Sequence, residues 1–366
     1  MKLTIGNEAY LINASDLDTE SEPEGDDPGD LSASSSDNNG AAGDGPAPRH
    51  VVARARGPRG RPRARGPRVP DRDWSPHGQA RARFPFTSNP GLKVNIDDPE
   101  DPLEFFELFF NDELIDLIVT QTNLFAQQFM NDKGLGLKRR SRAKQWEDTT
   151  GDEMRVYLGL YTTPWRRRRA EYQQYFSKRA SLDTPFFRDV MDYDRFVLLN
   201  KFLHFADNTK AGDDDTIPCK LYKLWPILQH LKRRFSEVYQ PERDVAIDES
   251  LMLWKGRLGW EQYIPSKRAR FGIKSFEICK SSSAYILDFF VYTGEGTVYD
   301  PGLDEDLPMR SKVILTLGRQ FFNKGYCINM DNFFSSPGLY DELCARSTDA
   351  VGTIRPNHKK VYPKTF

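Results

Sequence analysis

Aromatic residues are almost absent from the first quarter of this 366-residue chain. All 24 phenylalanines lie at Phe84 or later, and the only aromatic residues before it are Tyr10 and Trp74. A segment with so little apolar surface cannot offset the entropy that is lost when its backbone becomes ordered. We therefore expect residues 1–92 to form a disordered tail whose deletion leaves the melting temperature unchanged, and we expect the rest of the chain to build the core.

The predicted tail consists of two parts with opposite charge. Residues 1–47 contain eleven acidic side chains and one basic side chain, whereas residues 48–70 contain eight arginines and no acid. The arginines alternate with glycine and proline, so the tract suits neither a helix nor a strand. Guanidinium groups pair bidentately with phosphate oxygens, so the tract could contact nucleic acid. A nuclear-import signal and a solvated linker are equally compatible with this composition.

Several classes of protein are disfavoured by the remaining composition. No apolar run reaches the ~18 residues that a membrane-spanning helix needs, and the N-terminus lacks the basic and apolar pattern of a secretory signal. The cysteines form no C-x-x-C pair and are too few for a disulfide framework. We therefore expect no membrane partner and a reducing compartment. The cysteines are Cys219, Cys279, Cys327 and Cys344.

Residues 98–240 are predicted to form a helical region. Asp101 precedes a proline and can cap one helix, and Thr150 begins a Thr-x-x-Glu capping box. Apolar residues at helical spacing predict two further helices, over 187–205 and 221–238. The function expected of this helical region is DNA binding or dimerisation.

Residues 241–366 change to a pattern of strands and helices in the order β-β-β-α-β-α-β. Short links predict that the first three strands form an antiparallel meander, and helical crossovers predict that the later strands run parallel. The expected fold class is therefore α/β, with a mixed sheet. The predicted strands are 244–248, 272–279, 284–294, one ending at Asp331, and 350–354; the predicted helices are 309–325 and one that begins at Ser335 or Ser336.

Two aspartates, Asp248 and Asp331, end the first and fourth predicted strands. These strands are neighbours in the predicted topology, so the two carboxylates should lie close together although they are 83 residues apart. Adjacent carboxylates repel each other unless a cation neutralises them, and Mg²⁺ is a suitable cation. Two such ions could support phosphodiester transfer, which requires at least one more carboxylate. Alternatively, Asp248 could belong to a turn and Asp331 could cap the following helix.

Basic and aromatic residues alternate in the stretch between these two aspartates. Cations pair with phosphates and aromatic rings can stack on unpaired bases, so this stretch is a candidate DNA-binding surface. An ordinary solvated hairpin with its aromatic residues in the core would show the same pattern. The candidate DNA-binding residues are Lys255, Arg257, Lys267, Arg268, Arg270 and Lys274, and the aromatic residues among them are Trp254, Trp260, Tyr263 and Phe271.

Several long motifs resemble the piggyBac transposase family in the order in which that family carries them. They include AIDESLMLWKGRLGWEQYIPSKRARFGIKSFEIC, AYILDFFVYTG, KGYCINMDNFFSSPGLYDEL and VGTIRPNHK, and the resemblance covers about 98–360 with gaps. It implies an RNase H-like fold for residues 241–366 and an active site of three aspartates that binds two Mg²⁺ ions. Asp248 matches the first catalytic aspartate and Asp331 matches the second.

The resemblance also implies the partners of the chain. Enzymes of this family act as dimers in the nucleus on double-stranded DNA. They cut transposon ends and join the freed 3′-hydroxyl to TTAA target sites.

The chain departs from the family pattern at three places. The family's third catalytic aspartate and its cysteine-rich zinc domain lie downstream of the VGTIR-like segment, and the sequence ends at Phe366. Residues 161–179 carry the run Arg166–Arg169 where the family has an apolar helix, and this run could be solvated or could contact phosphate. Arg268 replaces a proline of the family pattern. We expect a transposase-derived protein with an incomplete, inactive site. A non-catalytic DNA-binding or chromatin-associated module and a fragment of an active transposase remain the alternatives.

Overall fold

The computed structural model describes most of the chain after the predicted tail. The described residues are 82–354, apart from 164–168, 170, 215, 255, 266, 268–269 and 295. Most of the predicted tail and most of the arginine run therefore lie outside the described residues. All described residues belong to one compact unit of the chain.

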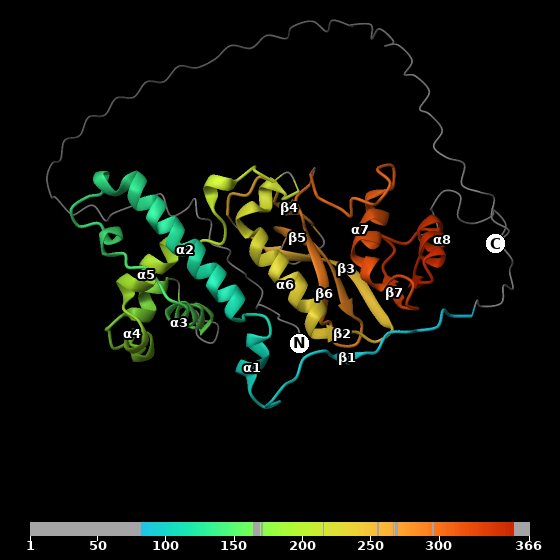
Figure 1. Ribbon diagram of the computed structural model, residues 1–366, viewed down its shortest axis with the longest axis horizontal. Coiled ribbons are helices and arrows are strands. Elements are labelled where there is room, and N and C mark those ends of the chain that lie inside the picture. Colours follow the sequence, from blue (N-terminus) through green and yellow to red (C-terminus); the bar gives the residue numbers. More distant parts are fainter. Residues whose placement is uncertain are drawn as a thin grey trace, which may run out of the picture. The chain divides into compact units, whose positions relative to one another are not determined.

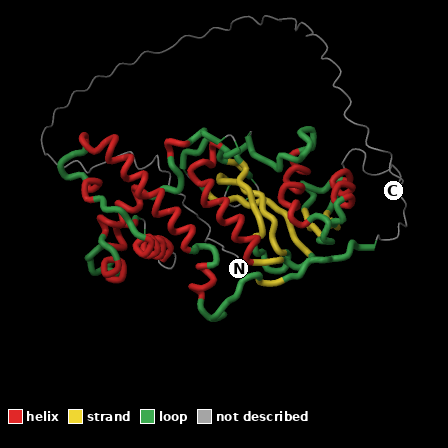
Figure 2. The backbone as a smooth tube through the Cα atoms, viewed as in Figure 1, coloured by secondary structure: helices red, strands yellow, loops and turns green. Residues whose placement is uncertain are grey.

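Helices dominate the first part of this unit, as the sequence predicts (Figures 1 and 2). Asp101 accepts a hydrogen bond from the Leu103 amide, and Asn111 and Thr150 cap the next two helices in the same way. None of the helices in the described ranges is long and apolar enough to cross a bilayer. The helices are α1 (Pro102–Glu107), α2 (Asp112–Lys133), α3 (Gly151–Thr162), α4 (Pro185–Val190), α5 (Tyr193–Phe202) and α6 (Trp225–Val238).

The helix predicted over 187–205 is wrong, because the structure has two helices there. Met191 is extended, with φ −151°, and it ends α4 with a buried side chain. Asp192 then caps α5 by accepting a hydrogen bond from the Asp194 amide. Burial of Met191 and the new cap together stabilise a break that the apolar spacing alone did not reveal.

The capping box at Thr150 is only half formed. The Thr150 hydroxyl accepts a hydrogen bond from the Glu153 amide, but the Glu153 carboxylate accepts its returning hydrogen bond from the Thr149 hydroxyl, at 2.7 Å, and not from the Thr150 amide. It also accepts two hydrogen bonds of 2.6 Å from the Arg195 guanidinium. This pairing ties α3 to α5 and holds the pKa of Glu153 below its usual value.

The second part of the unit is a six-stranded mixed sheet with two crossover helices. Strands β3, β5 and β6 form the predicted antiparallel meander, and β7 and β8 run parallel to their neighbours, so the order β-β-β-α-β-α-β is confirmed, apart from a short additional strand, β4, between the first two. The order across the sheet is β4-β5-β3-β7-β8, and β6 also pairs with β5. The elements are β3 (Asp244–Leu253), β4 (Gln262–Tyr263), β5 (Phe271–Lys280), β6 (Ile286–Tyr292), α7 (Met309–Gly318), β7 (Cys327–Met330), α8 (Pro337–Ala345) and β8 (Asp349–Gly352).

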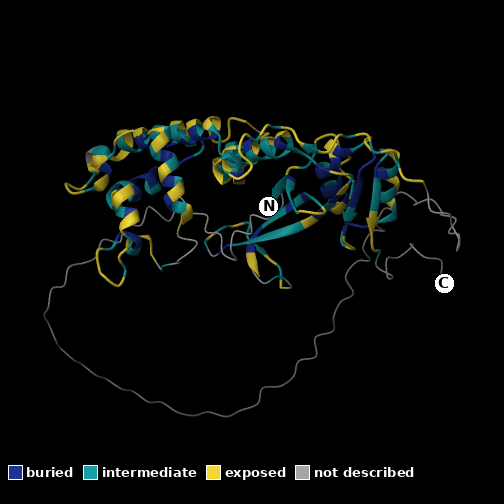
Figure 3. Cartoon of the chain, turned by 90° about the horizontal axis from the view of Figure 1, so that it is seen from below, coloured by how far each residue is buried: buried dark blue, intermediate teal, exposed yellow. Residues whose placement is uncertain are grey.

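One face of the sheet is covered by α7 and α8. Val245 and Ile247 of β3 pack with Phe276 of β5, Val313 of α7 and Leu343 of α8 in one buried cluster. Figure 3 shows buried positions gathered in the strands and on the inner sides of these helices. The opposite face carries the alternate residues of β3, which are more exposed, and this alternation is the period-2 pattern of a strand with one covered face.

Helix α6 packs beside the edge strand β6. The Lys232 ammonium lies 3.3 Å from the Asp288 carboxylate, and the rings of Phe235 and Phe289 are 6.1 Å apart. Asp288 and Phe289 are adjacent in β6 and point to opposite faces, so α6 follows the edge of the sheet.

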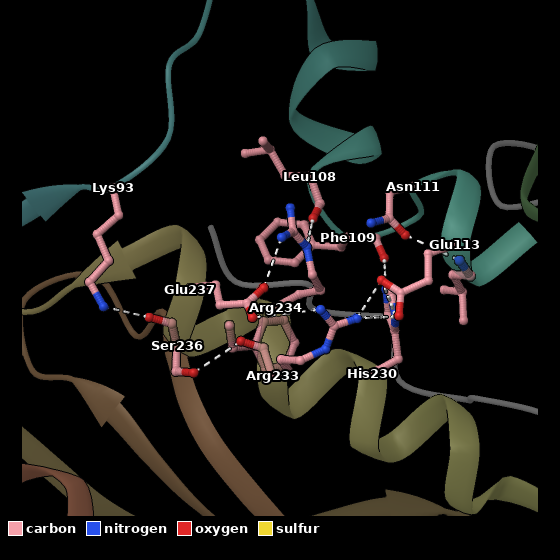
Figure 4. Close-up of polar contacts among 12 residues, drawn as sticks. Lys93, Leu108, Phe109, Asn111, Glu113, His230, Arg233, Arg234, Ser236 and Glu237 are labelled. Carbon is pink, nitrogen blue, oxygen red and sulfur yellow. Dashed lines mark hydrogen bonds and ion pairs between the residues drawn. The ribbon is translucent and has the colours of Figure 1, made fainter.

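The link between α1 and α2 is bound to α6 through backbone carbonyls (Figure 4), and a further carbonyl binds it to α3. The Leu108 carbonyl accepts a 2.7 Å hydrogen bond from Arg234, and His230 Nε2 lies 3.1 Å from the Phe109 carbonyl. Arg155 of α3 donates to the Phe110 carbonyl. The bonds from Arg234 and His230 join the helical region to the element that flanks the sheet.

The predicted boundary of the tail at residue 92 is too late. The Phe86 ring packs edge-on against Tyr326 at 4.9 Å, and the Thr87 amide donates to the Lys324 carbonyl. Strand β1 (Gly91–Leu92) pairs with β2 (Tyr239–Gln240). A composition argument cannot detect these contacts, because they depend on a few residues and on a surface that distant parts of the chain create.

Deleting residues 1–92 should therefore destabilise the protein, whereas deleting 1–81 should not. Loss of the Phe86 packing and of the β1–β2 pairing should lower the free energy of unfolding by about 2 kcal/mol, which corresponds to several degrees in melting temperature. Thermal unfolding of the two deletion variants tests this. In the shorter deletion, Phe86→Ala should lower the melting temperature and Leu92→Ala, at a position that is 55% exposed, should not. Equal melting temperatures for both deletions would show that residues 82–92 do not contribute to stability.

His204 should make the fold sensitive to acid. Its side chain is buried and stacks on Phe125, and burial, aided by the charge of Lys223, lowers its pKa to about 4. The unfolded chain binds the proton near pH 6.5, so stability should fall as the pH decreases from about 6.5 to about 4, by about 3 kcal/mol in total. Urea unfolding at pH 7.5 and pH 4.5 should show a smaller difference for His204→Leu than for the wild type. The same difference in both proteins would rule out His204 as the source.

Candidate active site

The parallel pairing of β3 with β7 brings Asp248 and Asp331 to one edge of the sheet. The last register pair is Ile247 with Met330, and each aspartate is the next residue on its strand. Neighbouring strands lie about 4.8 Å apart, so the two aspartates are side by side in the backbone framework. Both are exposed, while Ile247 and Met330 are buried.

The sequence predicted that Asp248 ends its strand, and this prediction is wrong. Strand β3 continues to Leu253 because it remains paired with β5 up to Gly272. Asp331 does directly follow the last residue of β7. Asp248 is therefore the point where β3 loses its neighbour β7, and the two carboxylates border the gap that begins there.

Each aspartate uses one carboxylate oxygen for a local hydrogen bond. Asp248 Oδ1 accepts from the Glu249 amide at 2.8 Å, and Asp331 Oδ1 accepts from the Phe333 amide at 2.9 Å. Helix α8 is capped by Ser336, so Asp331 forms a turn and is not the helix cap considered as an alternative. Within the described residues, Oδ2 of both aspartates accepts no hydrogen bond and can bind an external group.

Two glutamates close to this edge were not singled out from the sequence. Glu277 is the register partner of Asp248 on β5 and accepts a 2.6 Å hydrogen bond from the Ser275 hydroxyl. The Glu249 carboxylate lies 3.4 Å from the Lys267 ammonium. Alternation within the strand KSFEIC was the available signal for Glu277, because it places that residue on the face opposite Phe276.

The negative charge of this edge contributes to a raised pKa of Cys279. Burial raises the pKa of the Cys279 thiol to about 12, and Glu277 and Asp248 add to the effect. The thiol is therefore neutral at physiological pH, which is the weakly nucleophilic form of cysteine.

The two aspartates have the donor chemistry of a site for a hard cation. Mg²⁺ prefers oxygen ligands and can use one or two carboxylates together with water and phosphate oxygens. Across the described ranges, no group of three or more His, Cys, Asp or Glu side chains is placed to hold a metal ion. The residues present thus fit an ion that takes most of its ligands from water and substrate.

The predicted DNA-binding residues divide into two sets. Arg257 and Arg270 are exposed on the hairpin between β3 and β5. Lys267 and Lys274 have partners within the protein or are partly buried: Lys267 pairs with the Glu249 carboxylate, and Lys274 is half-buried on β5. Lys255 and Arg268 lie outside the described residues.

Two of the four aromatic residues in this stretch present their rings to solvent. Tyr263 and Phe271 form a register pair of β4 and β5, with ring centroids 4.6 Å apart and exposures of 55% and 51%. Trp254 is buried and belongs to the core. The aromatic pattern is therefore partly core and partly an exposed pair of rings beside Arg270.

The end of the arginine run has an internal role. The Arg169 guanidinium donates to the carbonyls of Gln174 and Leu182, and it lies 5.3 Å from the ring centre of Tyr175. These contacts tie Arg169 to the chain between Gln174 and Leu182. For Arg169, the structure favours an internal anchor over a phosphate contact.

A cavity of about 630 Å³ lies elsewhere, between α6, β6 and the segment from Val298 to Gln320. Neither Asp248 nor Asp331 lines it. Both aspartates are exposed to solvent, so the carboxylate edge is accessible from outside the protein.

Comparison with known proteins agrees with this geometry. A family model described as "Transposase IS4" matches residues 101–366. Human "PiggyBac transposable element-derived protein 3" is 30% identical over 265 residues, which cover 70% of this chain and 40% of that protein. Human "PiggyBac transposable element-derived protein 2" is 27% identical over 263 residues, which cover 69% and 40%.

A solved structure supports the same assignment. The piggyBac transposase in a synaptic complex with hairpin DNA is 25% identical, has a TM-score of 0.61, and is matched over 75% of this chain and 55% of that chain. This chain spans about half the length of that structure and less of the two curated relatives. The chain therefore belongs to the piggyBac-type family of DDE transposases and the proteins derived from them.

Proposed function

We propose that this transposase-derived protein binds double-stranded DNA at the carboxylate edge and the adjacent hairpin. The observation that carries the proposal is the position of Asp248 and Asp331, one residue beyond the last register pair of two parallel strands. The related piggyBac structure was solved with hairpin DNA, which supports DNA as the partner. A nuclear location and a homodimer on transposon ends or TTAA targets are part of the same proposal.

The two parts of this surface would contact DNA differently. Arg257 and Arg270 are exposed and can pair with phosphates, which contributes affinity that is independent of sequence. Tyr263 and Phe271 present two adjacent rings on which an unpaired base can stack. Asp248 and Asp331 would hold Mg²⁺ next to a phosphate, where the ion can stabilise negative charge on the phosphate oxygens.

DNA binding should depend steeply on salt. When the logarithm of affinity is plotted against the logarithm of salt concentration, each phosphate contact adds about −0.9 to the slope. The double variant Arg257→Gln, Arg270→Gln should therefore reduce the slope by about 2 in an anisotropy titration. Lys324→Gln is the matched control, because Lys324 is exposed just before the amino end of β7 and should not affect the slope. A slope near zero for the wild type would contradict phosphate binding.

Strand cleavage should be absent from the 366-residue chain. The two-metal mechanism needs at least three carboxylates, and the described residues supply no three-ligand group. Purified protein with Mg²⁺ or Mn²⁺ should therefore leave labelled transposon-end DNA intact. Metal-dependent nicking that disappears in Asp248→Ala would show that the chain has an active site.

A second candidate function is a non-catalytic DNA-binding or chromatin-associated module. The lack of a three-ligand group in the described ranges favours it. In this case the Asp248→Asn, Asp331→Asn variant should bind DNA as well as the wild type, with or without Mg²⁺. The first proposal instead predicts that Mg²⁺ strengthens DNA binding by the wild type only.

A further inference from the structure

Lys274 and Arg310 place their charges beside the same aromatic ring. Lys274 lies on β5, and Arg310 is in the first turn of α7. The Lys274 ammonium is 5.6 Å and the Arg310 guanidinium carbon is 4.4 Å from the ring centre of Phe333. The faces of aromatic rings attract cations, so Phe333 keeps two positive charges close together although they repel each other.

Two further rings fix the position of the Lys274 ammonium. Its nitrogen is 4.6 Å from the ring centre of Phe276 and 5.9 Å from that of Tyr292. Lys274 and Phe276 alternate along β5 with Glu277, the register partner of Asp248, so they point to the opposite face of the sheet. The half-buried ammonium therefore belongs to a site that is separate from Asp248.

Neither cation has an anionic partner in the described ranges. No described carboxylate lies within ion-pair distance of either charge, and neither side chain donates a hydrogen bond to a described residue. Glu249, which points to the same face of the sheet as Lys274, is paired with Lys267 at 3.4 Å. The first turn of α7 contains no acidic residue, and its amino end has no side-chain cap. The described part of the protein thus leaves the positive charge around Phe333 unpaired.

Other cations that stack on rings have acceptors of their own. Lys280, at the far end of β5, lies 5.0 Å from the ring centre of Tyr239 and pairs with Glu242 at 2.7 Å. An anion stabilises a partly desolvated cation, so the acceptor for Lys274 and Arg310 is expected to come from outside the chain. The other ring-stacked arginines and their acceptors are Arg142 with Asp194, Arg195 with Glu153, Arg346 with Glu342, and Arg169 with the Gln174 carbonyl.

We propose that Lys274 and Arg310 form a phosphate-binding site around Phe333, on the face of the sheet opposite Asp248. A guanidinium pairs bidentately with phosphate oxygens, and an ammonium adds a compact second charge. The uncapped amino end of α7 contributes the partial positive charge of its peptide dipoles. The phosphate group can come from a DNA strand or from a free anion. The choice of DNA rests on the proposed function.

Phe333 connects this site to the carboxylate edge. Its amide donates a 2.9 Å hydrogen bond to Asp331 Oδ1, while its ring lies between the two cations and the core. The site would extend the DNA-binding surface from Asp331 toward α7, away from the hairpin that carries Arg257 and Arg270.

The first test is the salt dependence of duplex-DNA binding by the full chain in an anisotropy titration. Lys274→Met keeps the packing on the rings and removes the charge. Combined with Arg310→Gln, it should reduce the slope by about 2, since each lost phosphate contact removes about 0.9. Arg310→Lys keeps the charge and should keep the slope. Circular dichroism checks folding, and Arg310→Gln alone, at an exposed position, should reduce the slope by about 1 if the double variant does not fold.

The second test is pyrophosphate binding to the full chain without DNA, measured by isothermal titration calorimetry. The double variant should bind pyrophosphate at least about tenfold more weakly than the wild type, because charge-assisted hydrogen bonds are lost. Lys280→Met is the matched control in both tests. It removes a ring-stacked lysine whose charge is already paired with Glu242, so it should change neither the slope nor pyrophosphate binding.

The two measurements separate the sources of the phosphate. A smaller slope in the double variant assigns the site to DNA, whereas weaker pyrophosphate binding with an unchanged slope assigns it to a free anion. No change in either measurement, or the same loss in Lys280→Met, would overturn the inference. If the wild type shows no salt-dependent DNA binding, the proposed function fails, and pyrophosphate binding still tests the site.

Discussion

The register between β3 and β7 is the constraint on which the rest of the site depends. Four pairs, from Asp244 with Cys327 to Ile247 with Met330, align the strands. A shift by one residue would turn every side chain of β7 to the other face and would point Asp331 toward the core. The buried side chains of Ile247 and Met330 resist such a shift, so apolar packing on one face fixes the two carboxylates at the edge.

The arrangement of helices leaves this edge accessible. Helices α7 and α8 cover the face that carries Val245 and Ile247, and α6 follows the edge strand β6. No described element covers the positions of Asp248 and Asp331, which remain exposed. The cavity beside α6 is a separate feature, because neither Asp248 nor Asp331 lines it.

The sequence allowed the order of the elements and the pairing of the two aspartates to be predicted. Helix caps such as Asp101 and Thr150 are local signals, and the meander follows from short connections. The break at Met191 and the docking of Phe86 were missed, because each depends on burial against residues distant in sequence. The continuation of β3 beyond Asp248 was missed for a similar reason, since only its pairing with β5 sustains it.

The sequence by itself determined which side chains were available near the site: two aspartates at the ends of apolar runs and a set of lysines and arginines between them. Only the tertiary structure decided which of those cations are partly buried and which are exposed. In sequence, Lys274 looks like another member of the basic stretch, equivalent to Arg270. Strand pairing places Lys274 among three rings, on the face of the sheet that carries Glu249 and Phe276, and leaves Arg270 exposed. Burial depends on contacts between distant strands, and local spacing does not encode those contacts.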